Sequence, residues 1–181
     1  MMLDDLLTRA QRLDNAALAE IHDRYYPEVY RYVRYRLYDE QVCEDICAEV
    51  FLRLLDALHK KRGPEHNLRG WLFGTASNLV NDHLRARYAR KVEVLDVEEN
   101  DLVDSEHLED SYEEDWMQQQ VRQALQDLTA EQQHVLALRF SGEYSLDDTA
   151  NLMGKSVTAV KGLQFRAIAS LRRLVEERIG G

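Results

Sequence analysis

Residues 93–115 constrain the architecture of this chain more than any other segment. They contain 12 acidic residues and no basic residue, within a chain of 181 residues whose net charge is −10. Like charges at this density repel one another and leave few apolar anchors for a core. We therefore expect two small domains, residues 1–92 and 116–181, joined by an acidic linker at 93–115.

The two blocks beside this segment are nearly neutral. Residues 1–92 contain 15 basic and 14 acidic residues, and residues 116–181 contain 8 and 7. The overall acidity therefore does not exclude a nucleic-acid partner, because either block is free to carry a basic face.

Both blocks have the pattern of helices. Glycine and proline number only 8 and 2, and no stretch alternates apolar with polar residues as a strand would. The sequence predicts an all-α fold in which Pro27 stands in the first turn of the second helix and Gly63-Pro64 separates the third helix from the fourth. The predicted helices are about 4–23, 26–38, 40–59, 68–90, 116–127, 131–141, 146–153 and 156–177.

Two of these helices have the spacing of a helix-turn-helix. Ser145 is a suitable N-cap for the first, Gly154 fits the left-handed residue at its end, and Ser156 caps the second. Two helices joined by a short turn containing glycine are typical of this DNA-binding motif.

The last helix has one apolar and one basic face. Its apolar face carries Val157, Val160, Leu163, Ala167, Leu171 and Leu174. The opposite face is basic, which suits phosphate contact, and Phe165 on it could contact a thymine methyl group. The alternative is a solvated amphipathic helix with an isolated exposed Phe.

Several segments resemble the extracytoplasmic-function sigma factors of the sigma-70 family. In the C-terminal block these are QQHVLALRF at 132–140 and SLDDTANLMGKSVTAVK at 145–161. In the N-terminal block they are YYPEVYRYV at 25–33, EDICAEVFLRL at 44–54 and LRGWLFGTASNL at 68–79. The resemblance implies a region 2-type bundle followed by a region 4-type helix-turn-helix bundle, and a subunit that guides RNA polymerase to promoters.

The resemblance also implies two DNA-reading surfaces. For the minus-thirty-five element, the candidate residues are Lys155, Ser156, Thr158, Ala159, Lys161, Gly162, Phe165 and Arg166. For the minus-ten element and strand melting, they are Trp71, Ser77, Asn78, Asn81, Arg85 and Tyr88. The polar face of helix 68–90 suits single-stranded bases, although Trp71 and the apolar-side His83 also have an interpretation as core residues.

A third surface is expected on helix 40–59. Its core side carries Val42, Cys43, Ile46, Cys47, Val50, Leu54 and Leu58. Leu52 is left as an apolar residue in an acidic face, which suits a protein contact, although a scattered surface leucine is the alternative. The candidate polymerase-binding residues are Asp45, Glu49, Leu52, Arg53 and Asp56.

The implied partners are core RNA polymerase, through its β′ coiled coil and β flap, and promoter DNA in double- and single-stranded form; an anti-sigma factor is a further candidate. We expect a cytoplasmic, non-enzymatic protein with no cofactor or metal, since no catalytic motif or membrane span is present. Cys43 and Cys47 are expected to be buried small residues. Two other functions remain open: a helix-turn-helix regulator that never docks on polymerase, and a protein adaptor.

The acidic linker has two interpretations. It is either a solvated tether, or a mimic of nucleic acid that occupies the basic channel through which RNA leaves the polymerase. The first needs only length, whereas the second needs charge.

Overall fold

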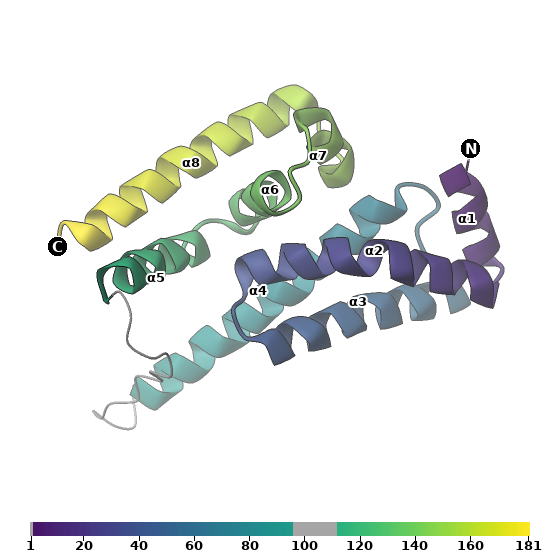
Figure 1. Ribbon diagram of the computed structural model, residues 1–181, viewed down its shortest axis with the longest axis horizontal. Helices are drawn as coiled ribbons and strands as arrows, with labels where there is room; N and C mark the ends of the chain where they lie inside the picture. Colours follow the sequence, from purple (N-terminus) through teal and green to yellow (C-terminus); the bar gives the residue numbers. More distant parts are fainter. Residues whose placement is uncertain (1, 96–111) are drawn as a thin grey trace.

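A computed structural model describes residues 2–95 and 112–181 of the chain. All the elements in this described part are helices, and they form two groups, α1–α4 and α5–α8, that lie against each other (Figure 1). The helices are α1 (Met2–Gln11), α2 (Asn15–Arg36), α3 (Glu40–His59), α4 (Leu68–Leu95), α5 (Tyr112–Gln126), α6 (Ala130–Ser141), α7 (Leu146–Met153) and α8 (Val157–Ile179).

The boundary between the first two helices differs from the prediction. The sequence suggested one helix over about 4–23 and a second beginning near Pro27, but α1 ends at Gln11 and Pro27 lies inside α2. Leu13 has a φ of 61°, and the carboxylate of Asp14 accepts hydrogen bonds from the backbone N–H groups of Ala16 and Ala17 at 2.9 and 3.2 Å. This N-cap starts α2 at Asn15.

The acidic segment overlaps helices at both of its ends. Helix α4 continues to Leu95, and α5 begins at Tyr112. The predictions about the linker rest mainly on residues 96–111, which lie outside the described residues.

Helix α3 buries the side that its pattern predicts. Six of the seven residues expected on the core side are buried, and Val42 is partly buried against the same core. The buried six are Cys43, Ile46, Cys47, Val50, Leu54 and Leu58. The apolar face predicted for helix α8 is also the buried one. Val160, Leu163 and Ala167 are buried, and the other three residues of that face are partly buried and pack around them.

The core of the N-terminal group extends into the C-terminal group. Ala137 and Leu138 of α6 and Leu152 of α7 belong to the same apolar cluster as the buried residues of α1–α4. A second, smaller cluster lies within α5–α8 and includes Leu136 and Val160. The two groups of helices are therefore packed into one closed body.

Candidate polymerase and nucleic-acid interfaces

Helices α7 and α8 form the helix-turn-helix that the sequence predicts. The hydroxyl of Ser145 accepts from the N–H of Asp148 at 3.0 Å, and that of Ser156 accepts from the N–H of Ala159 at 3.1 Å. Gly154 ends α7 with a φ of 63°, a conformation that costs glycine little and other residues more. These caps fix the turn between the two helices.

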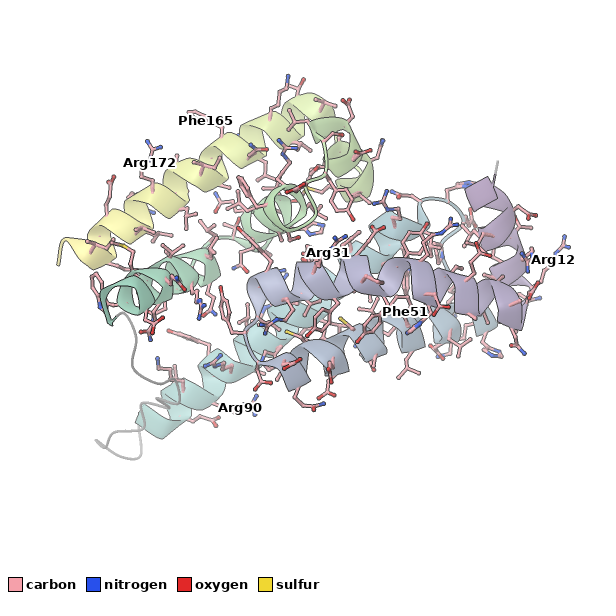
Figure 2. All side chains as sticks on the ribbon, in the orientation of Figure 1. Arg12, Arg31, Phe51, Arg90, Phe165 and Arg172 are labelled. Atoms are coloured by element: carbon pink, nitrogen blue, oxygen red, sulfur yellow. The ribbon has the colours of Figure 1, made fainter. Side chains whose placement is uncertain are left out.

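The polar side of α8 is open to solvent. Thr158, Ala159, Lys161 and Arg166 are exposed, and the side chain of Phe165 is 75% exposed. Phe165 and Arg172 project from the side of α8 that faces away from the N-terminal helices (Figure 2). The face keeps the position and exposure expected of a DNA-reading surface.

The beginning of this face holds a shallow hollow. Its volume is about 150 Å³, and its lining includes Lys155, Thr158, Gly162 and Arg166. Lys155 is half-buried and pairs with Glu131 of α6 at 2.9 Å, while Ser156 is exposed. A phosphate approaching this hollow would compete with Glu131 for the ammonium group of Lys155.

The candidate minus-ten residues on α4 differ in exposure. Asn78 and Arg85 are exposed, and Tyr88 is 72% exposed. Trp71 is half-buried against the apolar core, which agrees with its alternative interpretation as a packing residue. The exposed residues follow one another toward the C-terminal end of α4, where Arg90 lies (Figure 2).

Ser77 and Asn81 do not lie on an open polar face. Ser77 is only 6% exposed, and its hydroxyl accepts from Nη1 of Arg36 at 3.1 Å. Asn81 is half-buried, and its side-chain oxygen accepts from Nη2 of Arg36, which also donates to the side-chain oxygen of Gln133 of α6. The expectation of open access is wrong for these two residues, because α6 packs against this side of α4 and α2.

Four residues of this contact were absent from the sequence-based set. They are Tyr32 and Arg36 of α2, and Gln133 and His134 of α6. Nδ1 of His134 lies 2.6 Å from the hydroxyl of Tyr32, and burial lowers the pKa of His134 to about 4. A polar pair separated by a hundred residues leaves no periodic signal in a single sequence, so pattern analysis had no means of finding it.

A second polar cluster joins the two groups of helices. The guanidinium of Arg69 pairs with the carboxylate of Glu28 at 2.9 Å and lies 4.9 Å from the ring centroid of Tyr144. The hydroxyl of Tyr144 donates to Glu28 at 2.5 Å, and its ring meets Phe73 edge-on at 5.7 Å. Burial, followed by the nearby Glu28, raises the pKa of Tyr144 to about 12.

Helix α3 presents the expected apolar residue in a polar face. Leu52 is 59% exposed and Leu55 is 38% exposed. Around them, Arg53 pairs with Glu49 at 2.9 Å, and Lys60 pairs with Asp56 at 2.8 Å. Asp45 is also exposed and accepts from Gln41 one turn earlier. An apolar centre ringed by charged groups is the arrangement of a small protein-docking site.

The two cysteines are buried, as their position on the core side of α3 predicts. Cys43 and Cys47 are both fully inaccessible to solvent, and burial raises the pKa of Cys47 to about 12. His83 is half-buried on the same side of α4 as the core residues, and burial lowers its pKa. Within residues 2–95 and 112–181, His, Cys, Asp and Glu side chains form no cluster suited to a metal ion.

Comparisons with known proteins agree with this arrangement. The family model for sigma-70 region 2 matches residues 21–90, and that for sigma-70 region 4 matches residues 124–173. The chain is 33% identical to the ECF RNA polymerase sigma factor BldN of Streptomyces coelicolor over 96% of its own length and 66% of that protein. It is 29% identical to the ECF RNA polymerase sigma factor SigX of Bacillus subtilis, over 86% of this chain and 82% of SigX.

Solved structures show the same fold. CnrH, in complex with the cytosolic domain of CnrY, superposes with a TM-score of 0.64 at 22% identity, covering 96% of this chain and 97% of that one. RpoE of Bartonella quintana, in complex with the anti-sigma factor NepR, gives a TM-score of 0.55 at 18% identity, covering 87% and 96%.

The two family matches and the relatives define the class. The chain belongs to the sigma-70 family of RNA polymerase sigma factors. Within that family it is of the extracytoplasmic-function type. In the described part of the chain, no helix has the length and apolar character required to span a bilayer.

Proposed function

We propose that this chain binds core RNA polymerase in the cytoplasm and directs promoter-specific initiation, without catalysing a reaction itself. The observation that carries the proposal is that two different surfaces occur on one chain. Helix α8 offers an exposed basic face, whereas α3 offers an exposed Leu52 within a charged ring. A DNA-binding regulator requires only the first of these surfaces, and a sigma factor requires both.

The C-terminal domain, residues 116–181, reads the minus-thirty-five element in this proposal. Lys161 and Arg166 are exposed on α8 and carry the charge needed to contact phosphate or a guanine edge. Gly162 between them lets the backbone approach the groove closely. The exposed ring of Phe165 supplies an apolar contact for a thymine methyl group.

The N-terminal domain, residues 1–92, reads the minus-ten element and holds the melted strand. Asn78 is exposed on α4 and offers an amide that can both donate to and accept from a base edge. Tyr88 offers a freely accessible ring on which a base can stack, and Arg85 adds positive charge beside it. Trp71 has a packing role in the same domain.

Polymerase docking uses α3 as the anchor for the β′ coiled coil, and the C-terminal domain contacts the β flap.

An inhibitory partner is also part of the proposal, because CnrH and the Bartonella RpoE were both solved with proteins bound, CnrY and the anti-sigma factor NepR. The linker at 93–115 joins the two domains, and its charge supports a role in the RNA exit channel in addition to that of a tether.

In vitro transcription with purified core polymerase tests the proposal against the main rival. We expect the chain to direct run-off transcription from a promoter selected out of a genomic library, and the Leu52→Asp variant to lose transcription while keeping duplex binding. A plain helix-turn-helix regulator would bind the duplex but would not support transcription with either protein. Equal transcription by core polymerase with and without the chain would overturn the proposal.

A further inference from the structure

Arg36 is a buried arginine that forms no ion pair with a carboxylate among residues 2–95 and 112–181. Its side chain lies at the C-terminal end of α2 and is only 6% exposed. The guanidinium donates to four neutral oxygens, those of Tyr32, Ser77, Asn81 and Gln133. Its Nε is buried and has no hydrogen-bond partner in the part of the chain that the structure describes.

Such a site is electrostatically incomplete. Burying a cation is unfavourable unless an anion compensates for the water it loses, and neutral acceptors compensate only in part. Arg69, in the other polar cluster between the two groups of helices, has such an anion, because Glu28 faces it at 2.9 Å. Arg36 therefore occupies a place where a negative charge would be bound more strongly than the neutral oxygen of Gln133.

The closed packing cannot persist when the chain reads a promoter. The minus-thirty-five and minus-ten elements are about 25 base pairs apart, which corresponds to roughly 85 Å along the duplex. Helix α7 of the DNA-reading motif packs directly on α4, and Asn67, just before α4, donates to the backbone oxygen of Asn151 in α7 at 2.7 Å. Two elements in contact cannot read sequences that far apart, so the C-terminal group must leave α4.

The departure of α6 changes the surroundings of Arg36 in a defined way. Gln133 and His134 move away with α6, whereas Tyr32, Ser77 and Asn81 belong to α2 and α4 and remain. The guanidinium is then uncovered between two of the candidate minus-ten residues. One of its donor groups, which had served Gln133, becomes available.

We propose that Arg36 is a further DNA-binding residue, which contacts a backbone phosphate of the melted strand and is hidden beneath α6 in the closed chain. This inference rests on the proposed role of α4 as the strand-reading helix. In the closed chain, the side-chain oxygen of Gln133 occupies the position that a phosphate oxygen would take in the open one. The packing of α6 and the binding of single-stranded DNA compete for the same guanidinium.

Substitutions at Gln133 alter the competition in opposite directions. Both Gln133→Ala and Gln133→Glu lose the hydrogen bonds that Nε2 of Gln133 donates to the backbone oxygens of Gln126 and Leu128. Gln133→Ala also removes the neutral acceptor and should favour the open chain, whereas Gln133→Glu supplies the missing charge and should favour the closed one. Gln123→Ala is the matched control, because Gln123 also accepts from an arginine, Arg178, but within the C-terminal group. The probe is a fluorescein-labelled oligothymidylate of about twelve nucleotides, followed by anisotropy with the full chain.

We expect at least about fivefold tighter binding of the probe by Gln133→Ala, weaker binding by Gln133→Glu and no change for the control, since affinity scales with the open fraction. Hydrogen exchange of α6 and α4 reports opening independently, and circular dichroism verifies folding. Faster hydrogen exchange in Gln133→Ala without tighter binding of the probe would contradict the proposed competition between α6 and single-stranded DNA. Unchanged hydrogen exchange together with unchanged probe binding would contradict it as well.

The salt dependence of binding tests the phosphate contact itself. In the Gln133→Ala background, Arg36→Gln should lower the slope of log affinity against log salt by about 0.7, the value for one phosphate on a single strand. Arg36→Lys should keep the slope, because it keeps the charge. A purely structural role would lower stability and leave the slope unchanged in both variants, which would refute the proposal. This assay contains no polymerase, so its failure is distinguishable from a failure to direct transcription.

Discussion

The hydroxyl of Tyr32 on α2 lies 2.6 Å from Nδ1 of His134 on α6, although 102 positions separate the two residues in the chain. Their rings meet edge-on at 5.5 Å. A neutral imidazole can accept the hydroxyl proton at Nδ1, whereas a protonated one cannot. Because the imidazole is buried and the positive charge of Arg36 lies nearby, a proton on His134 is unfavourable in the closed chain, and the stability of the contact between the two groups of helices depends on His134 remaining neutral.

This dependence predicts a loss of stability in mild acid. Burial lowers the pKa of His134 from its ordinary 6.5 to about 4, so the unfolded chain binds a proton at a higher pH than the folded chain. The contribution of His134 is fully present above pH 6.5 and is lost as the pH falls from there toward 4. Between pH 6.5 and 5 the free energy of unfolding should fall by about 2 kcal/mol on this account.

Urea denaturation of the wild type and of His134→Gln at both pH values measures this contribution. The variant should be less stable near neutrality, but its stability should depend less on pH. Equal pH dependence of the two proteins would show that His134 is not the titrating group.

Leu52→Asp should abolish binding to core polymerase while leaving the helix content unchanged. Leu52 is 59% exposed, so the folded chain loses little when it is replaced. At the centre of an interface the cost should be about 2 kcal/mol or more. Pull-down against core enzyme measures the loss, with Val92→Asp, an exposed apolar residue near the C-terminal end of α4, as the control. Native affinity of Leu52→Asp would remove α3 from the docking site.

Lys161→Ala and Arg166→Ala should weaken binding to duplex promoter DNA. The loss should be roughly 1–3 kcal/mol for a residue that reads a base, while a residue that touches phosphate should mainly lower the salt slope. Electrophoretic mobility shifts across a salt series separate the two outcomes. Arg12 is an exposed arginine at the opposite end of the molecule (Figure 2), and Arg12→Ala should have no effect on DNA binding. If Lys161→Ala and Arg166→Ala also leave DNA binding unchanged, the basic face of α8 does not bind DNA.

Asn78→Ala should impair formation of the open complex more than binding to polymerase. Asn78 is exposed on α4, so the substitution should remove the proposed base contact without disturbing the fold. Permanganate footprinting of the melted thymines reports the effect. Asn15→Ala, an exposed asparagine at the start of α2, is the control, and normal thymine reactivity in the Asn78 variant would contradict the role.

Replacing the acidic residues between positions 96 and 110 by Ser and Gln at constant length tests the two interpretations of the linker. If its charge occupies the RNA exit channel, core affinity should fall, most strongly at low salt, where screening is weakest. The ratio of abortive to full-length RNA should also shift, because RNA would no longer displace the segment. A neutral linker that matches the parent in both assays would leave only the role of a tether.

The sequence was informative where a property repeats along one helix. The helical period identified the buried sides of α3 and α8 and the exposure of Leu52 and Phe165, because burial of these residues depends on one face of one helix. It failed at the start of α2, where the cap formed by Asp14 outweighed the expectation attached to Pro27.

The sequence could not predict the packing of the two groups of helices. Ser77 is polar and falls on the polar side of its wheel, yet Arg36 and the packing of α6 bury it. The contact of Arg36 with Gln133 spans 97 positions and involves one residue from each helix, so it has no period that could reveal it. Polar contacts of this kind become visible only in three dimensions.

The burial of both thiols has a consequence for oxidative conditions. The chain contains only two cysteines, Cys43 and Cys47, and both are inaccessible. The pKa of about 12 for Cys47 leaves on the order of one molecule in a hundred thousand as thiolate at neutral pH, and the thiolate is the nucleophile that attacks peroxides and disulfides. Oxidants that react through a thiolate therefore have little access to the two cysteines while the chain is folded.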